Sequence, residues 1–276
     1  MRLERFRAAK APELTALRRA AEEGRMPPAW AGPRPDFAAA LSARPAAGPL
    51  AVVAEYKRAS PSKGPICEAL SVEEAARQYA DAGAAALSVL TEEEWFHGEL
   101  AFLGRAAGAL EDAGASWLPL LRKDFIFDPL QVRATAATPA SALLLIVRLT
   151  PDAGVLRDLR ERTESCGMAA VVEVFDADDL ALARESGARI IQVNARDLES
   201  LRVDREAPLT LIRTSPPLAG EVWIAASGMD SFAHLARAAE AGYQAALVGT
   251  ALMARGEPGA ALTRLLTPDR EARHAD

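Results

Sequence analysis

The residues best placed to do chemistry are Glu55 and Lys57, which end the apolar run Ala51–Ala54. Because they are two residues apart on a strand, their side chains point to the side that the preceding apolar residues bury. A purely structural strand would not end with both charge signs on its core side. The turn at 60–64 then supplies two hydroxyls, an ammonium group and a glycine, which suits an anionic ligand. The sequence therefore predicts a polar site where this strand ends.

Polar or aromatic side chains also stand at the ends of most later apolar runs. The third run contains Lys123, and the fifth contains Glu173 between two valines. Taken alone, such a lysine is more often directed to solvent, and such a carboxylate is either paired structurally or functional. Converging at one end of a sheet, they indicate general acid–base catalysis. The other residues in equivalent places are Trp95, Phe96, Asn194, Arg196, Ser227, Gly228, Gly249 and Thr250.

Two groups among these residues each allow two interpretations. Trp95 and Phe96 are either core that caps the strands or an aromatic wall of a substrate pocket, which we favour because polar strand ends lie beside them. The small residues at 227–228 and 249–250 are either simple turns or a phosphate site built from backbone N–H groups. The second interpretation suits their position after the last two strands of the predicted sheet.

The elements that must position these residues begin near residue 50, where short apolar runs alternate with amphipathic segments. Unbroken apolar strands alternating with helices are typical of a parallel sheet covered by helices. Eight such units favour an α/β fold of the (β/α)8 TIM barrel type over a doubly wound sheet. The eight expected strands are Ala51–Lys57, Ala86–Thr91, Trp117–Phe125, Ala142–Val147, Ala169–Val174, Arg189–Arg196, Val222–Ser227 and Ala245–Thr250.

The length of 276 residues suits one such barrel. We therefore expect a single domain over 1–276. Within it, 1–47 would be an N-terminal helical extension with one or two helices and a proline-rich connection. Residues 48–268 would be the barrel, and 269–276 a tail. In the barrel, the carboxyl ends of all strands converge on one face, where catalytic groups are expected.

Bulk composition excludes several classes of function. A net charge of −6 and a pI near 5.3 argue against nucleic acid or an anionic membrane as the main partner. Two cysteines, Cys67 and Cys166, form neither a metal-like spacing nor a disulfide framework. His97, His234 and His274 lie outside the motifs above, so acid–base chemistry falls to carboxylates and lysines. No signal-peptide core or membrane-spanning run is evident, and we expect a cytoplasmic protein.

Several motifs together carry a resemblance to a known family. The two most specific are 54–64, Ala-Glu-Tyr-Lys-Arg-Ala-Ser-Pro-Ser-Lys-Gly, and 121–125, Leu-Arg-Lys-Asp-Phe. With the motifs given below, the chain resembles the indole-3-glycerol phosphate synthase family from its N-terminal helices to Met253. The resemblance covers nearly the whole sequence. The further motifs are Leu87–Glu92, Val172–Val174, Asn194–Leu198, Ser227–Gly228 and Leu247–Gly249.

The resemblance implies a lyase of tryptophan biosynthesis. Its substrate would be 1-(o-carboxyphenylamino)-1-deoxyribulose 5-phosphate, a phosphorylated aromatic amino-sugar that is closed to an indole ring with loss of carbon dioxide and water. No metal and no organic cofactor are expected, because protonation of the ketone replaces a Lewis acid. Other enzymes of the same pathway are candidate partners, whereas nucleic acid and membrane are not.

The resemblance also implies a role for each matching residue. Lys123 would protonate the ketone, and Glu173 would take up a proton and stabilise the cationic ring intermediate. Lys57, together with Glu55, would serve the dehydration and hold the substrate. The remaining roles are Asn194 on the sugar hydroxyls and the lysine network, Ser60 and Arg196 on the anthranilate carboxylate, and Ser227, Gly228, Gly249 and Thr250 at the phosphate.

Two departures from the family pattern fall inside the expected site. Ala226 stands where the family normally has a glutamate, and Gln192 stands where it has a small glycine. Three interpretations are open. The chain is an ordinary synthase with fewer groups around its catalytic residues, a paralogue that closes a modified anthranilate adduct, or a catalytically weakened barrel that serves as a binding partner. The intact Lys57, Lys123 and Glu173 argue against the last.

Overall fold

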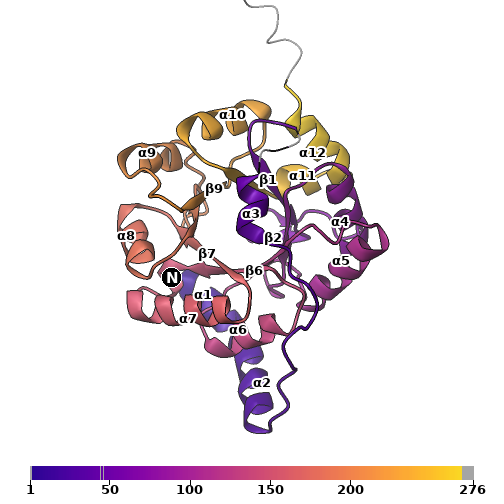
Figure 1. Cartoon of the computed structure of the whole chain (residues 1–276), viewed down its shortest axis with the longest axis vertical. Coiled ribbons are helices and arrows are strands. Elements are labelled where there is room, and N and C mark those ends of the chain that lie inside the picture. Colours follow the sequence, from indigo (N-terminus) through magenta and orange to yellow (C-terminus); the bar gives the residue numbers. More distant parts are fainter. Residues whose placement is uncertain (1, 44, 46, 269–276) are drawn as a thin grey trace, which may run out of the picture.

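The computed structural model describes residues 2–43, 45 and 47–268, and eight parallel strands of this part close into a barrel (Figure 1). Around the barrel the order is β1-β10-β9-β8-β7-β6-β5-β4, and β1 pairs with both β10 and β4. The predicted (β/α)8 TIM barrel is confirmed. The strands are β1 (Ala51–Tyr56), β4 (Ala86–Leu90), β5 (Leu120–Lys123), β6 (Ala142–Ile146), β7 (Ala169–Val174), β8 (Ile190–Asn194), β9 (Val222–Ala226) and β10 (Ala245–Val248).

The barrel strands are apolar because both of their faces are covered. All six residues of β1 are buried. Ala51 and Val53 belong to the apolar cluster inside the barrel, whereas Val52 and Ala54 belong to the cluster between the strands and the helices. Side-chain alternation therefore directs Glu55 into the barrel, where it is 3% exposed. This is the orientation that the sequence predicts for that residue.

Helices cover the outside of the barrel (Figure 1). Several begin at a side chain that accepts a backbone N–H bond, as Ser71 does before α4 and Asp176 before α8. Gly242 ends α10 with a φ of 108°, a conformation that favours glycine. The helices of the barrel are α4 (Val72–Asp81), α5 (Ala101–Asp112), α6 (Pro129–Ala136), α7 (Ala153–Ser165), α8 (Ala177–Glu185), α9 (Glu206–Thr214), α10 (Phe232–Ala241), α11 (Thr250–Met253) and α12 (Pro258–Leu266), with the 3-10 turn η1 (Val147–Leu149).

The N-terminal extension contains three helices in the described residues, whereas the sequence predicted one or two. These are α1 (Arg2–Ala9), α2 (Ala11–Glu22) and α3 (Phe37–Ser42). The third lies across the centre of the ring in Figure 1, and its Phe37 and Leu41 join the cluster inside the barrel. This helix was hard to predict because six residues are too few to show a helical period of apolar residues, and the prolines before it hide where it begins.

The third predicted strand is shorter than expected. It was predicted over Trp117–Phe125, but β5 covers only Leu120–Lys123. Trp117 is 56% exposed, so its apolar character does not reflect burial. Pro119, which has no N–H group, precedes the strand. The predicted tail, 269–276, lies outside the described residues, and none of the described helices is long and apolar enough to cross a membrane.

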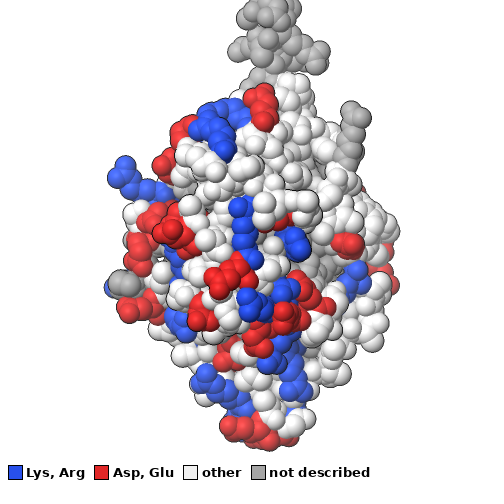
Figure 2. Space-filling view, turned by 60° about the vertical axis from the view of Figure 1, so that its left-hand side comes forward, with Lys and Arg blue, Asp and Glu red and all other residues white. Residues whose placement is uncertain are grey.

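Charged side chains on the outer surface are mixed in sign. Figure 2 shows acidic and basic residues side by side over the face that it presents. Many form ion pairs between or within helices, such as Arg148 with Asp176 at 2.6 Å and Arg162 with Asp158 at 2.7 Å. Exposed pairs of this kind contribute little to stability, about 0–1 kcal/mol each.

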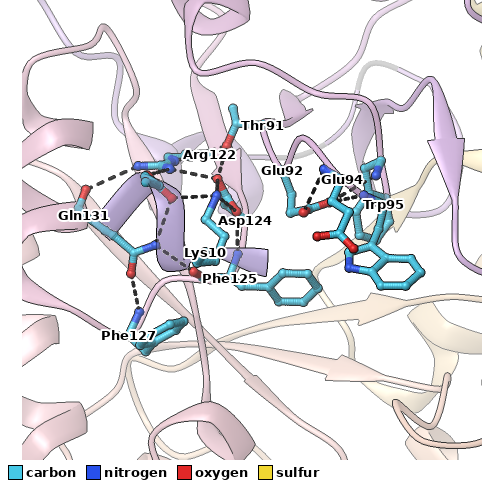
Figure 3. A network of polar contacts seen from close by, with 12 residues as sticks. Lys10, Thr91, Glu92, Glu94, Trp95, Arg122, Asp124, Phe125, Phe127 and Gln131 are labelled. Carbon is cyan, nitrogen blue, oxygen red and sulfur yellow. Dashed lines mark hydrogen bonds and ion pairs between the residues drawn. The ribbon is translucent and has the colours of Figure 1, made fainter. Parts of the chain in front are cut away.

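A buried ion-pair network joins the N-terminal extension to β5 (Figure 3). Arg122 and Asp124 flank Lys123 and point out of the barrel, where the two charges lie 2.8 Å apart. Lys10, between α1 and α2, places its ammonium group 3.0 Å from Asp124. The hydroxyl of Thr91 donates to the same carboxylate at 2.6 Å. We call Lys10, Thr91, Arg122 and Asp124 the clasp, because it fastens the extension to the strand that carries Lys123.

The clasp makes Asp124 strongly acidic. Burial alone would raise the pKa of Asp124, but Arg122, Lys10 and the Thr91 hydroxyl lower it to about 2, against an ordinary value of 3.8. A carboxyl whose pKa is lower in the folded than in the unfolded protein stabilises the fold above the unfolded value. This contribution is lost as the pH falls from about 4 towards 2.

We therefore predict that Asp124→Asn lowers the free energy of unfolding at pH 7 by about 3 kcal/mol, because Arg122 and Lys10 stay buried with Glu13 as their remaining counter-charge. In the wild type, acidification from about pH 4 to pH 2 should lower the contribution of Asp124 to the free energy of unfolding by roughly 2 kcal/mol. The variant has no such contribution to lose. Urea denaturation at each pH measures both effects.

The control is Asp112→Asn, at a side chain that is 78% exposed. It should change the free energy of unfolding by less than about 0.5 kcal/mol. Equal losses in the two variants would contradict the structural role of the clasp.

Candidate active site

The carboxyl ends of the strands surround a cavity of about 430 Å³. Its walls come from all eight strands of the barrel, from loops at their carboxyl ends and from α1. The structure brings together here all but one of the residues that the sequence predicted for the site. They are Glu55, Lys57, Ser60, Phe96, Lys123, Glu173, Asn194, Arg196, Ser227, Gly228, Gly249 and Thr250.

Glu55 and Lys57 form an ion pair at the end of β1. The Lys57 ammonium lies 2.7 Å from Glu55 Oε1, and the hydroxyl of Ser88 lies 3.5 Å from Oε2. The Glu55 side chain is only 4% exposed and that of Lys57 14%. Since a carboxylate so deeply buried needs a counter-charge, Lys57 is held at the cavity by the residue two positions before it.

Lys123 and Glu173 face each other from β5 and β7. The Lys123 ammonium lies 3.8 Å from Glu173 Oε2, and the carboxylate is 1% exposed. Gln192, the residue paired with Glu173 in the neighbouring strand β8, donates a hydrogen bond from Nε2 to the same oxygen. An ammonium group and a carboxylate in this arrangement can give a proton to one atom of a ligand and take one from another.

Asn194 and Ser227 are joined across the ends of β8 and β9. The Ser227 hydroxyl donates to Asn194 Oδ1 at 2.7 Å, and the backbone N–H of Arg196 donates to the same oxygen at 3.0 Å. Ser227 takes a positive φ of 67°, which is uncommon for a residue other than glycine and recurs at functional sites. Because both bonds engage Oδ1, the Nδ2 group of Asn194 is the one that can donate to a ligand.

Ser60 and Arg196 supply donors on the loops above the strands. Ser60 lies in β2 (Ala59–Ser60), which pairs with β3 (Gly64–Pro65) in the turn after β1. Its hydroxyl is buried and has no hydrogen-bond partner among the described residues. The guanidinium of Arg196 donates to Leu201 O at 2.9 Å. A buried donor without a partner beside a cavity calls for an acceptor from a ligand.

The aromatic side of the cavity differs in part from the prediction. Phe96 lines the cavity, but Trp95 does not, because its ring packs edge-on against Phe6 with centroids 6.0 Å apart. Phe6, from α1, stacks on Phe125 at 4.4 Å, and both line the cavity. Phe125 lies two residues after Lys123, so alternation along an extended chain places it on the same side, and the sequence could have indicated it. No sequence pattern indicated Phe6.

The loop that carries the aromatic pair is held by a buried carboxylate. Glu92 is 1% exposed and accepts backbone N–H bonds from Glu94, Trp95 and Phe96 at 3.0, 2.7 and 3.1 Å (Figure 3). Burial raises the pKa of Glu92, although these three bonds act in the opposite direction. The position of Phe96 at the cavity is therefore fixed by a side chain that does not line it.

Metal-binding residues are not gathered anywhere in the described part of the chain, where no three His, Cys, Asp or Glu side chains could hold an ion together. The reactive side chains that line the cavity are lysines, carboxylates, amides and hydroxyls. We assign no cofactor to it.

Comparisons with known proteins give one consistent result. The profile of the family described as "Indole-3-glycerol phosphate synthase" matches residues 3–265. A protein of that name from Mycolicibacterium vanbaalenii is 43% identical over 79% of this chain and 77% of its own length. One from Albidiferax ferrireducens is 40% identical over 83% and 84%. Among solved structures, a 3-hexulose-6-phosphate synthase shares the fold at 16% identity, with a TM-score of 0.61 over 78% of this chain and 98% of that one.

Proposed function

Because the chain belongs to the indole-3-glycerol phosphate synthase family, we propose that its cavity closes 1-(o-carboxyphenylamino)-1-deoxyribulose 5-phosphate to indole-3-glycerol phosphate. The reaction is a decarboxylating lyase step of tryptophan biosynthesis. The observation that carries the proposal is the pair Lys123 and Glu173, an ammonium group and a buried carboxylate that face the same cavity at 3.8 Å.

The charge of the cavity fits a substrate with two anionic groups. Although the chain carries a net charge of −6, five basic and three acidic side chains line the cavity. An excess of positive charge in a recessed site attracts an anionic ligand. The substrate carries a carboxylate at one end and a phosphate at the other. The lining charges are Lys57, Lys63, Lys123, Arg196 and Arg205 against Glu55, Glu173 and Asp230.

Ring closure forms a bond between the ketone carbon and the ring carbon that bears the carboxylate. The electron pair of the carbonyl double bond moves to oxygen, and Lys123 supplies the proton that this oxygen takes up. Positive charge develops on the anilino nitrogen and the ring, where the buried Glu173 stabilises it. The bond to the carboxylate then breaks, carbon dioxide leaves, and the electron pair restores the aromatic ring.

Dehydration converts the closed five-membered ring into the aromatic ring of the indole. The new hydroxyl leaves as water once it is protonated, and a proton is lost from the adjacent carbon to form the second double bond. Lys57 and Glu55 lie 2.7 Å apart. An ammonium group and a carboxylate this close can supply one proton and accept the other. Asn194, whose Oδ1 is already bonded, can hold a sugar hydroxyl through its Nδ2 group.

The two anionic ends of the substrate have candidate sites on different loops. The unpaired hydroxyl of Ser60 and the guanidinium of Arg196 suit the carboxylate. Gly228, at a φ of 75°, and Gly249 with Thr250, where α11 begins, suit the phosphate through backbone N–H groups. Phe6, Phe96 and Phe125 form an apolar wall for the aromatic ring between them.

Three expectations from the sequence stay predictions. They are a cytoplasmic location, contacts with other enzymes of tryptophan biosynthesis, and the specialised-pathway alternative. Relatives that bear the synthase name at 40–43% identity favour the ordinary synthase over that alternative.

We predict that the purified protein converts the substrate with a rise in indole fluorescence. Lys123→Ala should lower kcat about 10²–10⁴-fold, the range of general acid catalysis. Arg133→Ala, which removes an exposed basic side chain from α6, is the control and should leave kcat unchanged. A wild type without any signal would refute the proposed function, and an active Lys123→Ala variant would refute the assignment of the acid.

We predict that Ser60→Ala raises KM about threefold to tenfold with little change in kcat, because it removes one hydrogen bond to a carboxylate that is bound throughout ring closure. Steady-state kinetics measure the two constants separately. Ser165→Ala, at the exposed end of α7, is the matched control. A variant with unchanged KM would show that the carboxylate binds elsewhere.

We predict that Gly249→Ala lowers kcat/KM on the order of 10²-fold, since the added methyl would contact Glu55 Oε1 and lie 3.0 Å from Lys57 Nζ. In the control, Gly104→Ala in α5, the methyl meets no heavy atom within 4 Å. Far-ultraviolet circular dichroism should show both variants folded. An unimpaired Gly249→Ala enzyme would mean that this ion pair need not keep its position.

A further inference from the structure

Gln192 is a polar residue of the cavity to which the reaction above gives no role. It lies on β8, opposite Glu173 of β7, and is fully buried. Its Nε2 group donates to Glu173 Oε2, whereas its Oε1 atom has no hydrogen-bond partner among the described residues. Such an acceptor, buried and next to a cavity, is uncommon in a folded protein.

The orientation of the Gln192 amide follows from chemistry. An ionised carboxylate only accepts hydrogen bonds, so the NH2 group of the amide must face Glu173 and the oxygen must face away. The neighbouring strand β9 offers that oxygen no side-chain donor. Its residues in register with Gln192 and Asn194 are Ile224 and Ala226, which are both apolar. A molecule that fills the cavity can supply the donor that the described residues do not.

We propose that Gln192 is a positioning residue with two tasks. Its NH2 group holds the carboxylate of Glu173 in place, and its Oε1 atom accepts a hydrogen bond from an N–H or O–H group of the substrate. The inference rests on the proposed function, since that substrate offers both kinds of donor, the secondary amine between ring and sugar and the sugar hydroxyls. Gln192 thereby contributes to the recognition of the substrate's linker rather than of its anionic ends.

The first test compares Gln192→Leu with the wild type. The leucine fills a similar volume but can neither donate nor accept. We expect kcat to fall about tenfold or more, because Glu173 loses the donor that orients it. The affinity for the adduct whose ketone has been reduced to an alcohol, which cannot cyclise, should fall about threefold to tenfold for one lost hydrogen bond. Calorimetric titration measures that affinity.

Substrate analogues identify the donor. In one analogue the amine carries a methyl group in place of its hydrogen, and in two others one sugar hydroxyl is absent. Wild type and Gln192→Leu should bind equally well the reduced analogue that lacks the donor to Oε1, and differ for the others. A difference that persists undiminished for every analogue would overturn the proposed contact.

The variant Gln192→Glu tests the contact with Glu173. It replaces the NH2 donor with a second carboxyl group, and two ionised carboxylates side by side repel. Its kcat relative to wild type should fall as pH rises, although the Lys123 ammonium lies 3.8 Å from Glu173 and offsets part of the repulsion. A merely structural role gives a ratio that does not change with pH, and that result would overturn the proposal.

The control is Gln244→Leu, at the amino end of β10, where the side chain accepts from Trp223 N at 2.7 Å. It should leave kcat and the affinity unchanged. A wild type that does not turn over the substrate refutes the proposed function, and this inference with it. An active wild type beside a Gln192→Leu variant with the same kcat and affinity refutes this inference alone.

Discussion

Side-chain alternation along strands that close into a ring is the constraint on which the site depends. In β1 it sets Ala51, Val53 and Glu55 in one inward row, so the row that fills the barrel ends in an ion pair with Lys57. Only a shift of the strand by one residue would turn this row to the outer face of the barrel. The polar groups at its mouth therefore find their partners in one another, in the backbone of the loops or in a ligand. The unpaired atoms of Ser60 and Gln192 are a direct result.

The strand β5 shows how the same alternation serves two networks at once. Lys123 points inward to Glu173, while its neighbours Arg122 and Asp124 point outward into the clasp. Buried ion pairs add little net stability, but one that loses a partner costs a great deal, so they favour one arrangement over its alternatives. The clasp also fixes Lys10, four residues after Phe6, and this places an aromatic ring of the extension at the cavity.

The parts of the structure that could be predicted from the sequence are those encoded by local patterns. The alternation of apolar strands with amphipathic helices predicted the barrel. The charges at strand ends predicted that Glu55, Lys57 and Lys123 belong to the site. Phe6 was missed because its contact with Phe125 joins distant parts of the chain, and a helix far from any strand end carries no signal for it. The place of Trp95 behind Phe6 depends on that same contact. The hydrogen bond of Gln192 required knowing which atoms lie across two strands, which periodicity does not specify.

The ring of strands has a seam where the last strand to be synthesised meets the first. β10 pairs with β1 there, and Gly249 lets the backbone pass close to Glu55 and Lys57. Contacts between segments nearly two hundred residues apart form late and slowly in folding. On the ribosome, a chain that already contains Lys57, Lys123 and Glu173 still lacks β10, the strand that packs beside the ion pair of β1. Catalytic competence would thus be acquired when β10 closes the ring, and no proteolytic fragment short of β10 would inherit part of it.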